Sequence, residues 1–164
     1  LYLVTVNNRE ILGSTMTENL LVEFARLDPE AIIPTQGSPQ AAGWDLYALE
    51  ETIVERNRSS LIKTGLAIAI PPGWEGQIRC RSSLGKKGMI MPNGIGTIDS
   101  DYRGELMVLA TWIGAGEEFI VSKGERIAQL LFSRVPQVKF IEKSYDELGK
   151  TSRGTGGFGS SGRF

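Results

Sequence analysis

From residue 20 onward, hydrophobic residues form short runs or alternate with polar residues, and glycine, proline and asparagine separate the segments. Such alternation is typical of strands that bury one face. We therefore predict an all-β fold, a jelly-roll-like barrel or sandwich that protects its many sheet edges. The segments expected as strands are residues 20–27, 51–55, 61–70, 74–80, 104–112, 117–122, 126–135 and 137–142.

Helical signals are limited to two short segments. Residues 82–88 begin with serines that can cap a helix, and residues 144–150 contain Gly149, a C-cap signal. Turn residues cluster elsewhere, at 38–43, 71–74, 91–94 and 113–116. Helix is therefore expected to contribute little to the fold.

The chain divides into three parts. Residues 1–15 differ in character from the rest and form an N-terminal extension of unknown role, either an upstream segment or a fusion remnant. Residues 16–150 form the β domain, and the glycine-rich residues 151–164 form a flexible tail. At 164 residues the chain is long enough for a single core.

Composition restricts the partners and the compartment. The formal net charge is −1, which gives no electrostatic basis for binding nucleic acid or an anionic membrane. The apolar runs, such as residues 65–70, are far shorter than the roughly 20 residues that span a bilayer. We expect a soluble intracellular protein without nucleic-acid or membrane partners.

Histidine is absent and Cys80 is the only cysteine. These two facts exclude an intramolecular disulfide, Ser/His/Asp and Cys/His catalysis, and the usual histidine-bearing zinc sites. Cys80 has no histidine to activate it, so we interpret it as a structural thiol. A general base in this chain must be a carboxylate, a lysine or a tyrosine.

Residues 79–88 combine four basic residues with two serines and two glycines. If a helix begins near residue 82, its free N–H groups, the hydroxyls of Ser82 and Ser83 and the Arg81 guanidinium would converge on one anion. The alternative is a basic surface turn. The local sequence favours neither.

Carboxylates occur in two further segments that can carry chemistry. Residues 91–106 have the turn residues of a hairpin, and their Asp99 and Asp101 are candidates for a water-activating base. The alternative is a turn that these side chains cap themselves. Asp45 lies between two aromatic residues, where an ordinary exposed aspartate at the entry to a strand is an equal alternative.

The chain ends in a segment rich in glycine and serine, residues 152–164, which contains Arg153 and Phe158. So few apolar side chains cannot offset the entropy of ordering this segment on its own core. A guanidinium for phosphate and a ring for stacking suit a flexible strap that closes over a nucleotide. A disordered tail or linker is the alternative.

Five stretches resemble, in order and spacing, the five motifs of the homotrimeric dUTPases. They are AAGWDLYA (41–48), RSSLGKKG (81–88), GIGTIDSDYRGE (94–105), KGERIAQLLF (123–132) and RGTGGFGSSG (153–162). The resemblance covers about residues 20–162. It implies hydrolysis of dUTP to dUMP and pyrophosphate by a homotrimer with shared active sites.

The resemblance also implies roles for residues of the third motif. Asp99 matches the carboxylate that activates water for attack on the α-phosphorus. Tyr102 matches the aromatic residue that packs on the deoxyribose and excludes a ribose 2′-hydroxyl. Residues matched to uracil binding are Asn93, Gly96, Thr97, Ile98 and Met107.

The other motifs match the phosphate chain and the lid. Asp45 takes a supporting role around Mg²⁺, which the family holds through substrate phosphates and water without direct protein ligands. The residues matched to the phosphates are Arg81, Ser82, Ser83, Gln129 and, for the γ-phosphate, Arg153. The residues matched to the strap over uracil are Gly157, Phe158, Ser160 and Ser161.

The sequence departs mildly from the family pattern at Trp44, Ser83 and Glu125. Two alternatives remain open. The dCTP deaminases, including bifunctional ones, share the fold but carry a catalytic glutamate where this chain has Leu109. A non-catalytic scaffold would have lost one of the key residues, and all are present.

Overall fold

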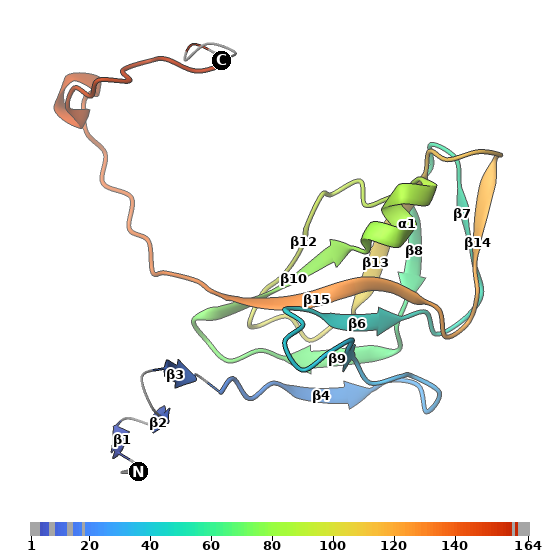
Figure 1. The fold of residues 1–164 in the computed structure, drawn as a ribbon. Helices are drawn as coiled ribbons and strands as arrows, with labels where there is room; N and C mark the ends of the chain where they lie inside the picture. The colour runs from blue at the N-terminus through green and yellow to red at the C-terminus, as the bar shows by residue number, and fades with distance from the viewer. Residues whose placement is uncertain (1–3, 7–8, 13–14, 18, 159, 161–164) are drawn as a thin grey trace.

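The computed structural model describes residues 4–6, 9–12, 15–17, 19–158 and 160 (Figure 1). Strands dominate the described chain, and the two helical elements are α1 (Ser82–Lys87) and the 3₁₀ helix η1 (Tyr145–Leu148). The prediction of an all-β fold with one or two short helices is confirmed. The strands are β1 (Val4–Val6), β2 (Arg9–Leu12), β3 (Thr15–Thr17), β4 (Glu23–Arg26), β5 (Thr35–Gln36), β6 (Trp44–Tyr47), β7 (Thr52–Glu55), β8 (Ser60–Lys63), β9 (Leu66–Ala69), β10 (Trp74–Cys80), β11 (Met89–Ile90), β12 (Gly96–Ile98), β13 (Met107–Trp112), β14 (Glu118–Val121) and β15 (Arg126–Arg134).

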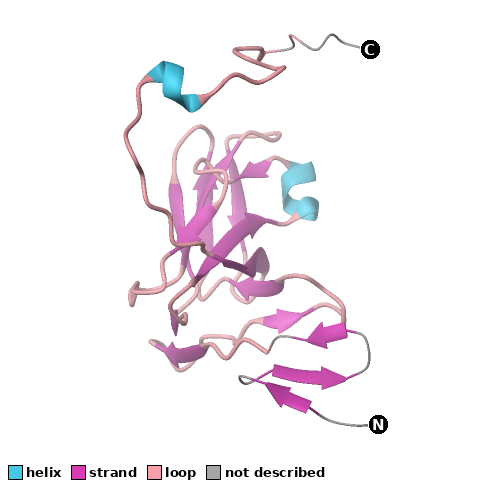
Figure 2. Cartoon of the chain, turned by 90° about the vertical axis from the view of Figure 1, so that its left-hand side faces the viewer, coloured by secondary structure: helices cyan, strands magenta, loops and turns pink. Residues whose placement is uncertain are grey.

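The strands pair antiparallel in several small sheets that wrap around one core (Figure 2). The largest sheet has the order β12-β10-β15-β6-β5, and its central ladder runs from Trp74 opposite Arg134 to Cys80 opposite Ala128. The smaller pairings are β11-β13-β8, β14-β7 and β4-β9. Within the described residues, no helix is long and apolar enough to cross a membrane.

The core is built by alternation along the strands. In β13, Val108 and Ala110 are fully buried, whereas Met107 and Leu109 on the opposite face are half-buried. Period-two burial of this kind is what a strand with one face on the core requires. Burial of such aliphatic side chains stabilises the fold by roughly 1.5–3 kcal/mol each.

Residues 61–70, expected as one strand segment, form two strands. Thr64 and Gly65 make the turn between β8 and β9, and Gly65 has a φ of +70°. A Cβ at this position would lie 3.0 Å from the Cβ of Ala31. The buried Thr64 hydroxyl donates to the carbonyl of Leu106 at 2.7 Å, which ties this turn to the start of β13.

Residues 137–142 were expected as a strand, and this prediction is wrong for the single chain. The segment is extended but pairs with no described strand, and it leaves the barrel after β15 (Figure 1). Val138, Phe140 and Ile141 are 65%, 98% and 78% exposed. Hydrophobic alternation alone cannot form a strand, because backbone pairing needs a neighbouring edge.

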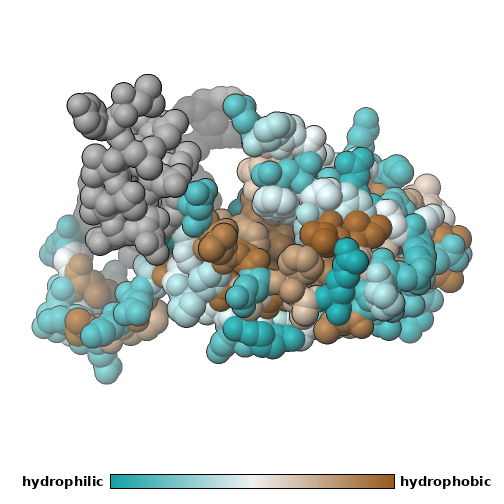
Figure 3. Space-filling view, turned by 90° about the horizontal axis from the view of Figure 1, so that it is seen from below, coloured by the Kyte–Doolittle hydropathy of each residue, from teal (hydrophilic) through white to brown (hydrophobic). Residues whose placement is uncertain are grey.

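An apolar groove of about 340 Å³ lies along β4 and β9. Phe24, Ile33, Trp44 and Phe132 line it together with other apolar residues. Figure 3 views the molecule from below and shows hydrophobic residues gathered on this face. Exposed apolar surface of this kind marks a site where another segment or molecule packs.

The N-terminal strands β1, β2 and β3 form a three-stranded antiparallel sheet of their own. The predicted boundary between residues 15 and 16 falls inside β3, where Met16 pairs with Ile11.

Gly88 sets the position of α1. It has a φ of +113° and closes the helix, and a Cβ here would lie 2.4 Å from the Cα of Gly114. We expect Gly88→Ala to lower the free energy of unfolding by about 3 kcal/mol, because backbone clash adds to the strain of positive φ.

Gly73→Ala is the matched control, because Gly73 has a φ of +84° and open space around it. It should cost only about 1–2 kcal/mol in the same urea denaturation measurement. Equal losses for the two variants would contradict the role assigned to the contact with Gly114.

Candidate active site

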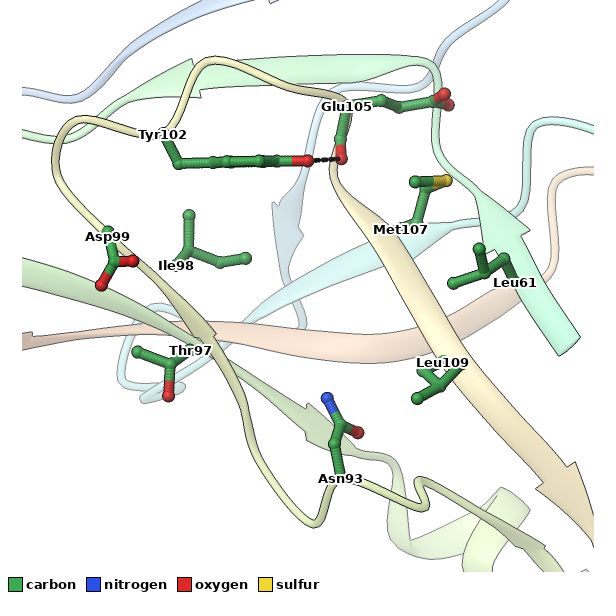
Figure 4. A pocket seen from close by; sticks show the side chains of 9 residues that line it. All are labelled: Leu61, Asn93, Thr97, Ile98, Asp99, Tyr102, Glu105, Met107 and Leu109. Atoms are coloured by element: carbon green, nitrogen blue, oxygen red, sulfur yellow. Dashed lines mark hydrogen bonds between the residues drawn. The ribbon is translucent and has the colours of Figure 1, made fainter. Parts of the chain in front are cut away.

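A pocket of about 260 Å³ opens between β12 and the start of β13 (Figure 4). One wall comes from the β12 segment and the other from β13 and β8, so aliphatic and polar groups face each other across it. The lining residues are Leu61, Asn93, Thr97, Ile98, Asp99, Tyr102, Glu105, Met107 and Leu109. Five residues that the resemblance matches to base or sugar binding therefore line the same pocket as Asp99: Asn93, Thr97, Ile98, Tyr102 and Met107.

The pocket exists because β12 and β13 diverge. Residues 91–106 were expected to form a hairpin, but β12 pairs with β10, with Gly76 opposite Ile98 and Ile78 opposite Gly96. Strand β13 pairs instead with β8 and β11. The expected hairpin pairing is therefore wrong, and the space between its arms is the pocket.

A tight turn places Asp99 at the rim of the pocket. The N–H of Tyr102 donates to the Asp99 carbonyl at 3.1 Å. The Arg103 guanidinium closes the turn by donating to the carbonyls of Ser100 at 2.7 Å and Tyr102 at 2.8 Å. Asp99 is exposed and lines this pocket, whereas Asp101 points into the adjoining space near Trp74.

The ring of Tyr102 is fixed across the top of the pocket (Figure 4). Its hydroxyl donates to the Glu105 carbonyl at 3.0 Å. The ring lies against Gly104, where a Cβ would come 2.3 Å from the Tyr102 hydroxyl oxygen, so a side chain at position 104 would displace the ring. An aromatic face held in this way is a rigid platform for a flat or apolar part of a ligand.

A second group of polar residues surrounds Asp45 on β6. Asp45 is only 4% exposed, and it forms ion pairs with Arg81 at 3.3 Å and Arg126 at 3.2 Å. Arg81 also donates to the Arg126 carbonyl at 3.1 Å. The alternative of an ordinary exposed aspartate is wrong, because antiparallel pairing of β6 with β15 carries this side chain inward.

Helix α1 follows Arg81 directly and completes this group. Arg81 is the N-cap, without a side-chain capping hydrogen bond, so the expected serine cap is wrong. Ser82 and Ser83 lie in the first turn with exposed side chains, because the extended backbone of Arg81 shifts the helix start by one residue. Gln129 lies opposite both Asp45 and Arg79 in the β-sheet.

The two groups do not share a pocket within one chain. None of Asp45, Arg81, Ser82, Ser83 and Gln129 is among the residues that line the space beside Asp99. The structure therefore gathers the sequence-predicted residues into two groups, the Asp99 pocket and the group around Asp45. We call the second group the phosphate half, after the role that the sequence predicts for it.

The described tail residues lie outside the barrel and away from both halves (Figures 1 and 2). Arg153 donates to the Gly156 carbonyl at 2.8 Å, and Phe158 is fully exposed with a φ of +48°. Gly157 accepts the N–H of Ser160 at 2.9 Å. Ser161 lies outside the described residues.

Sequence reasoning missed two residues of these groups. Arg126 joins Asp45 in the phosphate half, and its place three residues before Gln129 in the fourth stretch was the available signal. Glu105 lines the pocket, and only its place at the end of the third stretch pointed to it. Leu109 adds an aliphatic wall where the deaminases carry a proton-transferring glutamate.

Cys80 directly precedes Arg81 at the end of β10. Burial raises the pKa of its thiol, and a hydrogen bond from Gly85 opposes this only partly. Its sulfur lies 3.4 Å from the Met89 carbonyl. A half-buried thiol with a raised pKa is a poor nucleophile, which supports a structural role.

Residues 29–162 match the family model described as dUTPase. The chain belongs to the dUTPase family. The deoxyuridine 5′-triphosphate nucleotidohydrolase of Solibacter usitatus is 42% identical over 151 residues, which cover 90% of this chain and all of that protein. That of Nautilia profundicola is 46% identical over 143 residues, which cover 87% of this chain and 99% of that protein.

Solved structures of dUTPases share the fold. The dUTPase of Staphylococcus bacteriophage 80alpha, solved with dUpNHpp, superposes with a TM-score of 0.70 at 27% identity. The match covers 87% of this chain and 98% of that one. The jelly-roll-like fold expected from the sequence is thereby confirmed.

Removal of Asp45 tests the electrostatics of the phosphate half. We expect Asp45→Ala to lower the free energy of unfolding by about 2–4 kcal/mol, because two guanidinium groups lose their buried counter-ion. The Arg126 side chain is half exposed, so water screens part of the loss. Urea denaturation measures this change.

The control breaks an exposed ion pair. Lys123 and Glu30 lie 2.8 Å apart, and both side chains are more than half exposed. Lys123→Ala should cost less than about 1 kcal/mol. If Asp45→Ala lowers the free energy of unfolding as little as this control does, Asp45 is not the stabilising counter-ion of Arg81 and Arg126.

Proposed function

We propose that this chain hydrolyses dUTP to dUMP and pyrophosphate. The observation that carries the proposal is the convergence on one pocket of residues that the sequence assigns to base, sugar and water, namely Asn93, Thr97, Ile98, Asp99, Tyr102 and Met107. Family membership and the names of the curated relatives support the same substrate. Removal of dUTP keeps uracil out of DNA and supplies dUMP for thymidylate synthesis.

The pocket walls would bind the nucleoside. Backbone groups around Asn93, Gly96 and Thr97 would pair with the uracil edge, with Ile98 and Met107 as apolar walls. A site built from such groups rejects cytosine, because buried polar groups would be left unpaired. The Tyr102 ring would pack on the deoxyribose and leave no space for a 2′-hydroxyl.

Asp99 would act as the general base. Its carboxylate lies at the pocket rim and is accessible to water. The carboxylate takes a proton from water, the water oxygen bonds to the α-phosphorus, and the bridging P–O bond to pyrophosphate breaks. No covalent enzyme intermediate forms in this scheme.

The phosphate half would bind the triphosphate. Arg81 supplies a guanidinium for the phosphates, and Ser82, Ser83 and Gln129 supply neutral donors. The ion pair with Asp45 holds the Arg81 guanidinium in place. Arg153 from the tail would pair with the γ-phosphate.

A Mg²⁺ ion fits this half as a substrate-bound cofactor. The described residues contain no cluster of three metal-ligating side chains, so the triphosphate and water would supply the ligands. Asp45 Oδ1 is buried and lies 3.3 Å from Arg81 Nε, so Asp45 would support the metal-bound triphosphate by orienting Arg81. The ion, when bound, offsets phosphate charge. A structural Mg(II) ion occurs in the phage phi11 dUTPase.

Complete sites would form only in a homotrimer. One subunit would supply the Asp99 pocket, a second the Arg81 half, and a third the tail. The exposed Val138, Phe140 and Ile141 support this assembly, because a neighbouring subunit would cover them. Such sites would act inside the cell, where nucleoside triphosphates are found.

The tail would close the assembled site. Within the β domain of residues 16–150 the site is open, and residues 151–164 would order when nucleotide binds. Phe158 would cover uracil, and Gly157, Ser160 and Ser161 would complete the strap, with the glycine letting the backbone approach the ligand closely. Closure excludes water and brings Arg153 to the phosphates.

Replacement of Asp99 tests the general base. Asp99→Asn keeps the shape of the side chain but cannot accept the proton, so kcat should fall by about 10²–10⁴-fold. Binding of dUpNHpp, measured by calorimetry, should change little. Near-normal turnover would mean that another group is the base.

Product analysis of the unaltered protein accompanies this test. With dUTP and Mg²⁺ we expect dUMP and pyrophosphate. Release of ammonia would favour a deaminase, and no turnover at all would favour a scaffold.

Mixed trimers test the shared site. Asp99→Asn and Arg81→Ala should each be nearly inactive alone. After joint refolding at equal amounts, about a quarter of the sites should combine an intact Asp99 with an intact Arg81, because each comes from a different subunit. Activity should recover to about that fraction, whereas a site contained in one chain would show no recovery.

A further inference from the structure

Glu105 uses two different groups to join the pocket to the barrel. Its carbonyl accepts the Tyr102 hydroxyl at 3.0 Å. Its carboxylate accepts the backbone N–H of Gly65 at 2.8 Å. None of the roles assigned above involves this side chain, although it lines the pocket.

The partner of the carboxylate is a rigid part of the fold. Gly65 is buried in the turn between β8 and β9, and its carbonyl accepts the N–H of Leu27 at 2.8 Å. Leu106, the residue after Glu105, makes two further hydrogen bonds to the same turn. Its carbonyl accepts the Thr64 hydroxyl, and its N–H donates to the Leu66 carbonyl. The Glu105 carboxylate thus connects the exposed turn of residues 99–102 to a buried one.

The ring of Tyr102 depends on this connection. Tyr102 is 40% exposed, and its turn is closed by the hydrogen bond from the Tyr102 N–H to the Asp99 carbonyl and by the Arg103 contacts with main-chain carbonyls. These contacts hold the backbone of the turn, whereas the end of the ring is held by the Glu105 carbonyl. If the Glu105 side chain were released, the peptide that carries the acceptor of the Tyr102 hydroxyl would be held by the hydrogen bonds of Leu106 alone, and that acceptor would be less firmly fixed. The buried Gly65 N–H would also lose its partner.

We propose that Glu105 is a positioning residue for sugar discrimination: its carboxylate, clamped to Gly65, holds the Tyr102 ring against the deoxyribose. The clamp matters more for ribose than for deoxyribose, because rejection of a 2′-hydroxyl requires a ring that cannot move aside. This inference rests on the proposed contact between Tyr102 and the sugar.

The test compares kcat/KM for dUTP and UTP in Glu105 variants. Glu105→Ala should lower the dUTP-to-UTP preference by about five- to tenfold, mainly by improved use of UTP. Glu105→Gln keeps a carbonyl oxygen for the Gly65 N–H and should retain the preference of the unaltered protein. Glu105→Asp is too short to reach Gly65 and should behave like alanine, which preserves the test if the alanine variant fails to fold.

Asp28→Ala is the matched control. Asp28 also accepts a backbone N–H in a turn, from Glu30 at 2.8 Å, but it lies outside the pocket. This variant should leave the preference unchanged. An equal fall of kcat/KM for both substrates in Glu105→Ala, or an equal loss of preference in Glu105→Gln, would overturn the clamp.

Tyr102→Phe separates failure of this inference from failure of the proposed function. The variant removes the hydroxyl that Glu105 holds, so adding Glu105→Ala to it should lower the preference little further. Additive losses would overturn the inference. If Tyr102→Ala has full discrimination, the proposed sugar contact itself is wrong. If Tyr102→Ala loses discrimination and Glu105→Ala does not, only the inference fails.

Discussion

The antiparallel ladder between β10 and β15 is the interaction on which both halves of the site depend. On one edge of β10, pairing with β12 draws the Gly96–Ile98 segment away from β13 and opens the pocket. On the other side, β15 pairs with β6 and brings Gln129 opposite Asp45. The end of β10 leads directly into Arg81 and α1. One ladder thus places the Asp99 pocket and the residues around Asp45 in a fixed relation within the chain.

Different interactions hold the two halves in place. The pocket is held by main-chain hydrogen bonds and by a fixed aromatic ring, which suits recognition of a base and a sugar. The phosphate half is held by charge, since a buried carboxylate fixes a guanidinium that would otherwise lose entropy on binding. If sites are shared between subunits, as proposed above, this separation within one chain makes catalysis depend on assembly. Exposed apolar residues in the segment after β15 would then link that assembly to burial of hydrophobic surface.

The described residues of the glycine-rich tail are separate from the core. Its described residues make only local contacts such as Arg153 with Gly156, so their order does not depend on the core. A segment of this kind can bind and leave without unfolding the barrel. Stability therefore resides in the ladders and the core, while the closure proposed for the tail would involve a part of the chain that contributes little to either.

The sequence by itself determined the all-β class, the position of α1 and the identity of the chemical groups, because alternation and turn residues act locally. It also placed Asp99 and Tyr102 in one turn, since they are close in the chain. It could not decide whether Asp45 was buried, that β12 pairs with β10, or that residues 137–142 remain unpaired. Glu105 likewise gained its partner from a turn remote in sequence. Those outcomes depend on which distant segments meet, and only tertiary packing selects the partners of a strand or a buried charge.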